Sequence, residues 1–360
     1  MDRSEPQRPG INWAVVRTTA HRAVGDNWLE VGEPLEQLRA RYAAFVADAK
    51  HLIAEFTGWS LPAVPENVDV TDREGWVDVN IDQFRRLFDA LTPAFLPEPG
   101  PSALNRVLAG AGATALSVQV GLLLGFLARL VLGQFDVALF GAAADRRVLF
   151  VEPNIQGMIE SMGVDPDSFR FYLSLHETTH AAEFAAHPWL AEYLMDLLRE
   201  YAGSAGDNSL SALLGHLVGH YLDDEPAGAL GHLISEEQRA IFARLQAVMS
   251  LIEGYSDYVM HELAPRRLRD AAAIEREFAA RRQHRSALRR VLFQLTGLDL
   301  KLAQYEMGRQ FVSQVIEQAG RAAIDHVWRG PESLPTLSEI QHPSRWLKRM
   351  GFAASAEDER

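Results

Sequence analysis

The sequence contains no cysteine among its 360 residues. This absence excludes disulfide bonds, cysteine nucleophiles and thiolate metal sites. Any metal ion that the chain binds must therefore be held by histidine, aspartate or glutamate, through imidazole nitrogen or carboxylate oxygen.

Positive charge is also scarce, with 35 Lys and Arg against 48 Asp and Glu and a formal net charge of −13. Phosphate binding needs a dominant positive surface, so we expect no nucleic-acid partner. The stretch "MDRSEPQRPGINW" has no basic segment followed by an apolar run. We therefore expect no signal peptide and a cytoplasmic location.

Long apolar runs are few. The one that needs attention is "TALSVQVGLLLGFLARLVLG" (114–133), which has the length of a membrane span. Gln119 and Arg129 interrupt it, and several small residues precede it. These features favour a buried helix, so we expect no membrane span.

Apolar residues at helical spacing occupy most of the chain. We predict helices over 35–58, over 71–91 with a capping box at Thr71 and Glu74, and from Asp165 to just before Pro188. Ser235 and Gln238 form another capping box, which opens a long helix over 236–263. Residues 135–154 read as two short strands around a polar turn. The predicted fold class is mainly α with a small antiparallel sheet.

Composition divides the chain at one place, the proline-rich "LPEPGPS" (96–102). We predict a disordered tail at 1–10, an N-terminal helical region at 11–95 and a catalytic region at 103–350. The two ordered regions could also pack as one domain.

The stretch "YLSLHETTHAAEFAAHP" (172–188) carries the chemistry. On a helix His176 and His180 lie on one face, so both imidazoles can bind one ion. Glu177 is the next residue along the helix after His176, where its carboxylate can reach a water molecule bound to the ion rather than the ion itself. This is the H-E-x-x-H arrangement of zinc peptidases.

A catalytic zinc ion needs a third protein ligand and a fourth position for water. The metzincin pattern requires glycine at 183 and histidine at 186, but the chain has Glu183 and Ala186, and His187 is out of register. The gluzincin pattern requires a glutamate on a later helix with an aspartate one turn further on. Glu253 and Asp257 supply it, 73 and 77 residues after His180.

In the gluzincin pattern Glu253 binds the ion, and Asp257 accepts a hydrogen bond from a ligating imidazole.

A second histidine pair at i and i+4, His216 and His220, has no adjacent glutamate base. Glu183, three residues past His180, either braces a ligand or serves as a surface or capping residue.

"HETTHAAEF", "EGYSDYVMHE" and "LDLKLAQYEMGRQFV" together resemble a family of bacterial zincin-like metallopeptidases. Many members of that family are named only as candidate hydrolases, or are linked to biosynthesis of a deazaflavin cofactor. The resemblance extends from "INWAVV" to the C-terminal helices, and its anchors are His176, Glu177, His180 and Glu253. It implies a zincin core and a bound Zn²⁺.

If zinc is bound, Glu177 is the expected general base, and one further donor must stabilise the oxyanion. The candidates for this donor are His261 and Tyr305, with Tyr255 and Tyr258 as further options. By the family resemblance, the strand at 148–153 pairs with an extended substrate; a strand that only covers the core is the alternative.

The function predicted from the sequence is zinc-dependent hydrolysis of peptide bonds, with a peptide or protein substrate. The alternative is a zincin-derived scaffold that binds metal and serves a binding or regulatory role. A helical bundle without metal is a third hypothesis.

Overall fold

The protein was analysed as a computed structural model, which describes residues 11–25, 34–61, 64, 67–95, 103–135, 147–204, 235–284 and 304–352. The predicted tail at 1–10, the connector at 96–102 and the His216 and His220 pair lie outside these ranges.

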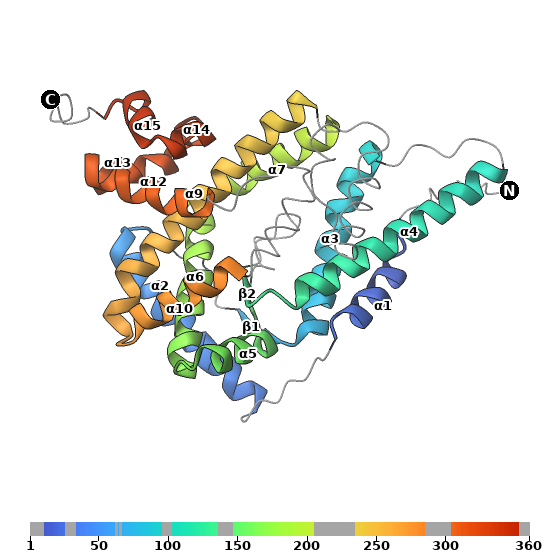
Figure 1. Ribbon diagram of the computed structural model, residues 1–360, viewed down its shortest axis with the longest axis horizontal. Helices are drawn as coiled ribbons and strands as arrows, with labels where there is room; N and C mark the ends of the chain where they lie inside the picture. Colours follow the sequence, from blue (N-terminus) through green and yellow to red (C-terminus); the bar gives the residue numbers. More distant parts are fainter. Residues whose placement is uncertain are drawn as a thin grey trace.

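In the described ranges the chain forms helices around one small three-stranded sheet, which confirms the predicted mainly α fold (Figure 1). The elements in chain order are α1 (Trp13–Ala23), α2 (Leu35–Thr57), β1 (Val68–Thr71), α3 (Arg73–Phe95), α4 (Ala103–Ala128), β2 (Gly133–Phe135), β3 (Val148–Val151), α5 (Glu152–Met162), α6 (Pro166–Ala186), α7 (Trp189–Gly203), α9 (Glu236–Arg267), α10 (Ala271–His284), α12 (Gln304–Ala319), α13 (Arg321–Ile324), the 3₁₀ turns Asp325–Arg329 and Pro331–Ser333, α14 (Leu337–Gln341) and α15 (Pro343–Arg349).

The sheet has the strand order β1-β3-β2 and mixed pairing. β2 and β3 pair antiparallel, with Phe135 opposite Val148, as the hairpin prediction required. β1 adds a parallel pairing, with Val68 also opposite Val148, which the sequence analysis did not predict. Because β3 is paired on both sides, it cannot take a substrate strand, and the assignment of 148–153 to that role is wrong. In the described part of the chain, β2 is the outer strand that lies against α6.

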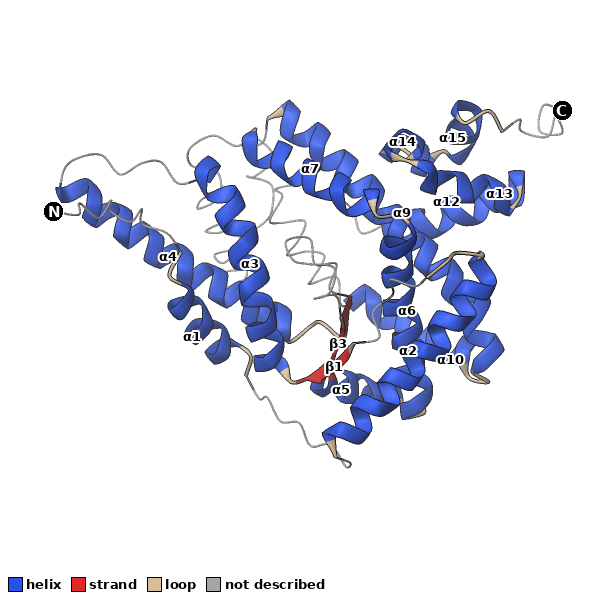
Figure 2. Cartoon of the chain, turned by 180° about the vertical axis from the view of Figure 1, so that it is seen from behind, coloured by secondary structure: helices blue, strands red, loops and turns tan. Residues whose placement is uncertain are grey.

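β3 is buried on both faces because it separates two hydrophobic cores. Val148 and Phe150 face a large core that includes residues of α2, α6, α9 and α12. Leu149 and Val151 face a smaller core made with α1, α3 and α4. Each such side chain contributes roughly 1.5–3 kcal/mol by leaving water. Figures 1 and 2 show the corresponding two groups of helices on opposite sides of the sheet.

The predicted apolar helix at 114–133 forms as part of α4, which packs along α1 in the smaller core but ends at Ala128, so that Gly133 begins β2 instead. Every fourth side chain on one of its faces is fully or almost fully buried, at Leu116, Val120 and Leu124. Among the described helices, none has both the length and the hydropathy to cross a bilayer.

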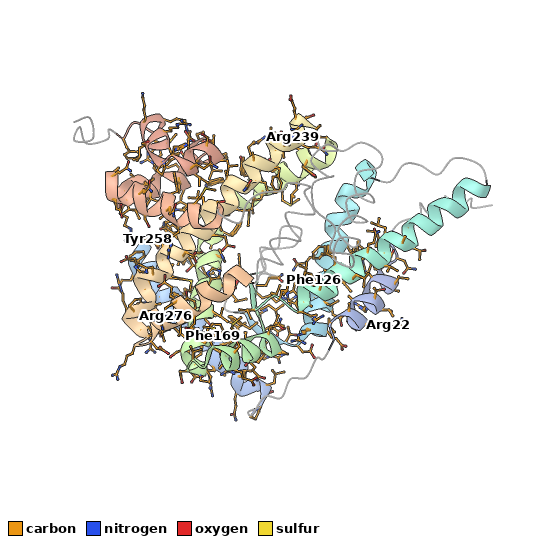
Figure 3. The ribbon with its side chains drawn as sticks, in the orientation of Figure 1. Arg22, Phe126, Phe169, Arg239, Tyr258 and Arg276 are labelled. Atoms are coloured by element: carbon orange, nitrogen blue, oxygen red, sulfur yellow. The ribbon has the colours of Figure 1, made fainter. Side chains whose placement is uncertain are left out.

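α6, the helix that carries the histidine motif, begins and ends where its sequence predicts. The Asp165 side chain accepts a hydrogen bond from the Ser168 amide at 2.8 Å, and Pro166 occupies the first turn. His187 closes the helix directly before Pro188. Phe169, labelled in Figure 3, is fully buried in the first turn and fixes that end of α6 in the large core.

The start of α3 differs from the prediction by two residues. Thr71 ends β1, and Asp72 caps the helix by accepting a hydrogen bond from the Gly75 amide at 2.8 Å. The capping box at Thr71 and Glu74 is therefore wrong: Thr71 is taken up by the parallel pairing with β3.

A buried polar triad ties α2 and α5 to α6. Glu152 accepts a hydrogen bond from the Tyr42 hydroxyl at 2.7 Å and two from the Arg170 guanidinium. Tyr42 and Glu152 are fully buried and Arg170 nearly so. Helices from both predicted regions thus share one core, consistent with the option that they pack as a single domain; the division itself stays a prediction.

α9 and α12 cross at two glycines. A Cβ on Gly308 would lie 2.0 Å from the Ser250 carbonyl oxygen, and one on Gly254 would lie 2.3 Å from the carbonyl carbon of Gly308. The backbones of α9 and α12 are in direct contact here, so movement of a flexible side chain could not make room for an added methyl group. The crossing lies one residue from Glu253 and sets how close α9 approaches α12.

We expect Gly308→Ala to destabilise the protein by about 1–3 kcal/mol, because its methyl group overpacks the crossing. Chemical denaturation measures the effect. Gly112→Ala is the matched control: it also adds a methyl group to a helix, at a position with nothing within 4 Å. That change is expected to be neutral or slightly stabilising. Equal stability of the Gly308 and Gly112 variants would contradict the close crossing.

Candidate metal centre

α6 brings the two motif histidines together. His176 and His180 are one helical turn apart, and their Nε2 atoms lie 3.2 Å from each other. Their side chains are only 16% and 14% exposed. Two imidazole nitrogens thus point at one place near the surface of the large core.

α9 supplies the third group. Glu253 Oε2 lies 3.9 Å from Nε2 of each histidine, and the three side chains form a cluster that could hold a metal ion. Zinc held tetrahedrally at about 2.0–2.2 Å separates its ligands by roughly 3.3–3.6 Å. The observed triangle fits these separations with shifts of a few tenths of an ångström. The structure therefore brings together the three residues that the sequence predicted as ligands.

Negative charge surrounds the two imidazoles. Burial lowers the pKa of His180, but its hydrogen bond with Glu183 and the charges of Glu253, Glu183 and Glu177 raise that pKa to about 10. Burial also raises the pKa of Glu177 and of Glu183 to about 7. Several carboxylates thus surround an imidazole that can give up its proton. Such a concentration of negative charge favours the binding of a divalent cation.

His180 is oriented by a fully buried carboxylate. Its Nδ1 donates to Glu183 Oε2 at 3.0 Å, which leaves Nε2 directed at the other two ligands. The Ser256 hydroxyl lies 3.2 Å from the same Nδ1. Glu183 therefore braces a ligand; the surface alternative is wrong because the side chain is 0% exposed. Carboxylate–histidine pairs of this kind fix the tautomer and the ring direction at metal sites.

His176 has a different neighbour. The Met260 sulfur lies 3.1 Å from its Nδ1, on the turn of α9 that follows Asp257. Sequence analysis missed both Met260 and Ser256, since only the packing of α9 on α6 makes them neighbours of the histidines. Asp257 is half-buried on α9, and its predicted bond to an imidazole stays a prediction.

Glu177 is held against the sheet. The residue is 7% exposed, and its Oε2 accepts a hydrogen bond from the Phe135 amide of β2 at 3.1 Å. Glu177 directly follows the candidate ligand His176 on α6; burial and the charge of Glu253 raise the pKa of its carboxyl, and the charge of His180 lowers it. The residue predicted as general base is thus bonded to the outer strand β2, and its role as base stays a prediction.

The candidates for the oxyanion donor have different surroundings. His261 is 62% exposed and pairs with Glu275 at 3.3 Å, and Tyr305 lies in the first turn of α12, where only the backbone is described. Tyr255 is fully buried and stacks on Trp59. Tyr258, labelled in Figure 3, packs beside Phe56. The donor roles of His261 and Tyr305 stay predictions.

His187 stacks on Trp328 with ring centroids 4.9 Å apart, and its ring meets Trp59 edge-on. Burial lowers the pKa of His187 to about 4. It is a half-buried residue packed against two tryptophans at the end of α6, in accord with its failure to match the metzincin register.

An H-E-x-x-H helix whose imidazoles meet a glutamate from a second helix defines a metal site of the zincin class. A family model described as zincin-like metallopeptidase matches residues 11–347 of the chain. The chain belongs to this family.

A solved structure agrees with this assignment. The chain is similar, at 34% identity and a TM-score of 0.73, to a protein from Chloroflexus aurantiacus described as a candidate hydrolase with a novel fold. The match covers 96% of this chain and 100% of that one. A search of curated proteins gave no match. The family and this neighbour support a hydrolase. The deazaflavin connection, the location and the partners stay predictions.

We expect Glu183→Gln to weaken zinc binding by about 10–100-fold, because the amide orients His180 less strongly. Competition with a chromophoric chelator measures the affinity. Glu192→Gln on α7 is the control, an equal change at an exposed position. Unchanged affinity in the Glu183 variant would show that this carboxylate does not support the site.

Zinc uptake is expected to release protons. His180 is protonated at neutral pH because its pKa is raised to about 10, and zinc binds the neutral ring. The apparent affinity should therefore rise with pH, about tenfold per pH unit for each proton displaced. Calorimetric titrations at pH 6, 7 and 8 test this, and a pH-independent affinity would contradict the charged environment described here.

Proposed function

We propose that the protein is a zinc-dependent peptidase that hydrolyses amide bonds with Glu177 as general base. The observation that carries the proposal is the convergence of His176, His180 and Glu253, with Glu177 beside them on the same helix. The family membership and the hydrolase neighbour support the coarser class, a hydrolase.

The ligand residues come from two helices whose positions are independently secured. α6 is capped by Asp165 and buried in the large core, and α9 is fixed by the glycine crossing with α12. A bound zinc ion would supply a Lewis acid that makes water nucleophilic near neutral pH and polarises a carbonyl group. Neutral His176 and His180 and ionised Glu253 would hold it, with Glu183 keeping Nε2 of His180 directed inward.

Glu177 is suited to accept a proton from the attacking water. Burial raises the pKa of its carboxyl to about 7, so the group can take up a proton and give it away again near neutral pH. It would pass that proton to the leaving amine. The Phe135 amide keeps the carboxylate from turning away from the cluster.

β2 suits an extended peptide as substrate. Its pairing with β3 leaves its second edge without a neighbouring strand among the described residues; the Phe135 amide on this edge bonds to Glu177, so a peptide would pair with the edge beside that bond. A peptide backbone can add to such an edge as a further strand. This role replaces the one assigned from the sequence to 148–153.

The alternative is a metal-binding scaffold without catalysis. That role requires the ligands but no buried carboxylate beside them. Glu177 is ionisable, almost fully buried and held by a backbone amide, an arrangement that costs stability and that a scaffold does not need.

The purified protein is expected to contain one zinc ion per chain and to cleave members of a fluorogenic peptide library. Glu177→Gln should retain the zinc but lose activity by about 10²–10⁴-fold, the usual contribution of a general base. Zinc content is measured by elemental analysis and turnover by fluorescence. Equal turnover by the two proteins would refute the proposed base, and zinc binding without any cleavage would favour the scaffold.

A further inference from the structure

β2 directs alternate backbone groups to its two edges. The Val151 amide donates to the Leu132 carbonyl at 2.8 Å, and Gly133 stands opposite Phe150 in the antiparallel register. In such a ladder, residues that bond to the partner alternate with residues that face away from it. The backbone groups of Gly133 and Phe135 therefore face away from β3, and the Phe135 amide bonds to Glu177 there.

Gly133 leaves room for the Glu177 carboxylate. A Cβ at this position would lie 2.6 Å from Oε1, 2.7 Å from Cγ and 2.8 Å from Cδ of Glu177. All three separations are shorter than real Cβ contacts. The backbone of Gly133 does not have a positive φ, so its conformation alone does not require glycine. The requirement comes from the carboxylate that fills the space.

β2 is itself held from the opposite direction. Gln134 accepts a hydrogen bond from the Trp76 indole at 2.7 Å and donates one to Asn80 at 2.9 Å. Trp76 and Asn80 are both buried on α3. Together with the pairing to β3, these bonds limit how far β2 can move if Glu177 is pushed against it.

We propose that β2 is a seat for the catalytic carboxylate, in which Gly133 is a positioning residue that acts through Glu177. The seat has two parts: the Phe135 amide, which binds Oε2, and the space above Gly133, which receives the rest of the carboxylate. This inference rests on the proposed function for its catalytic consequence, but the contact itself is independent of any activity.

A misplaced base slows the chemical step without affecting the ligands. A displacement of about 1 Å can reduce the rate of a positioned reaction by about 100-fold. The three atoms nearest to a Cβ on Gly133 all belong to Glu177 and none to the candidate ligands His176, His180 and Glu253, so a methyl group there acts on Glu177 first. A methyl group added at Gly133 should therefore lower kcat and leave the zinc affinity unchanged.

A double-mutant cycle on stability tests the contact directly. Gly133→Ala is expected to lower the Tm of the metal-free protein by about 3 °C or more, because its methyl group overlaps the Glu177 side chain. In the Glu177→Ala background the same change should lower the Tm by less than about 1 °C, since the overlapping atoms are gone. Gly157→Ala, at an exposed helical position with nothing within 4 Å, is the control for an added methyl group.

One outcome of the double-mutant cycle would contradict the proposed contact between Gly133 and Glu177. An equal loss of Tm in both backgrounds would mean that glycine is needed for the backbone alone, and would overturn the proposal. If Gly133→Ala does not fold, folding of the Gly133→Ala/Glu177→Ala protein supports the contact, and failure of both refutes it.

The kinetic experiment uses a peptide that the wild-type enzyme cleaves. Gly133→Ala should reduce kcat at least tenfold while KM and zinc affinity change less than about twofold. In the Glu177→Ala background, which removes all three overlapping atoms, Gly133→Ala should cost little of the residual activity. If Gly133→Ala reduced kcat by the same factor in both backgrounds, or reduced zinc affinity as much as kcat, the proposed seat would be contradicted. If the wild-type protein cleaves no peptide, the proposed function fails while the stability cycle still decides the contact.

Discussion

The concentration of carboxylates around two imidazoles is the constraint on which the rest of this structure depends. Glu177, Glu183 and Glu253 all act on His180, and two of these side chains are almost wholly removed from water. Buried groups of like charge repel each other, and each one favours a positive neighbour. A divalent cation at the point where His176, His180 and Glu253 converge would resolve that conflict, and the supporting elements keep these side chains together.

Two kinds of support operate at different distances. Close to the site, a hydrogen bond from His180 to Glu183 fixes the orientation of the imidazole ring, and the Phe135 amide of β2 binds Glu177. Further away, β3 is buried between two cores, and α9 meets α12 with no side chain between the backbones. The fold thus brings Glu177, the proposed general base, from the helix that carries two of the candidate ligands into contact with β2, and β2 is held by further contacts to β3 and α3.

Local features could be predicted from the sequence because their causes are local. Asp165 and Pro166 determine where α6 begins, and helical geometry alone places His176 beside His180. Glu253 was found from a known pattern of spacing, since the sequence contains no signal that α9 packs on α6. The parallel pairing of β1 with β3 joins segments about eighty residues apart, and four-residue strands give little periodicity to detect. The contact of Gly133 with Glu177 was missed for the same reason: it exists only after the sheet has formed.

The most direct test of this account is the position of zinc in a crystal of the zinc-loaded protein, measured by anomalous diffraction on both sides of the zinc absorption edge. The account predicts one strong peak about 2.0–2.2 Å from Nε2 of His176, Nε2 of His180 and a carboxylate oxygen of Glu253. A zinc-loaded crystal with no peak between these three side chains, or with its peak at other residues, would contradict it.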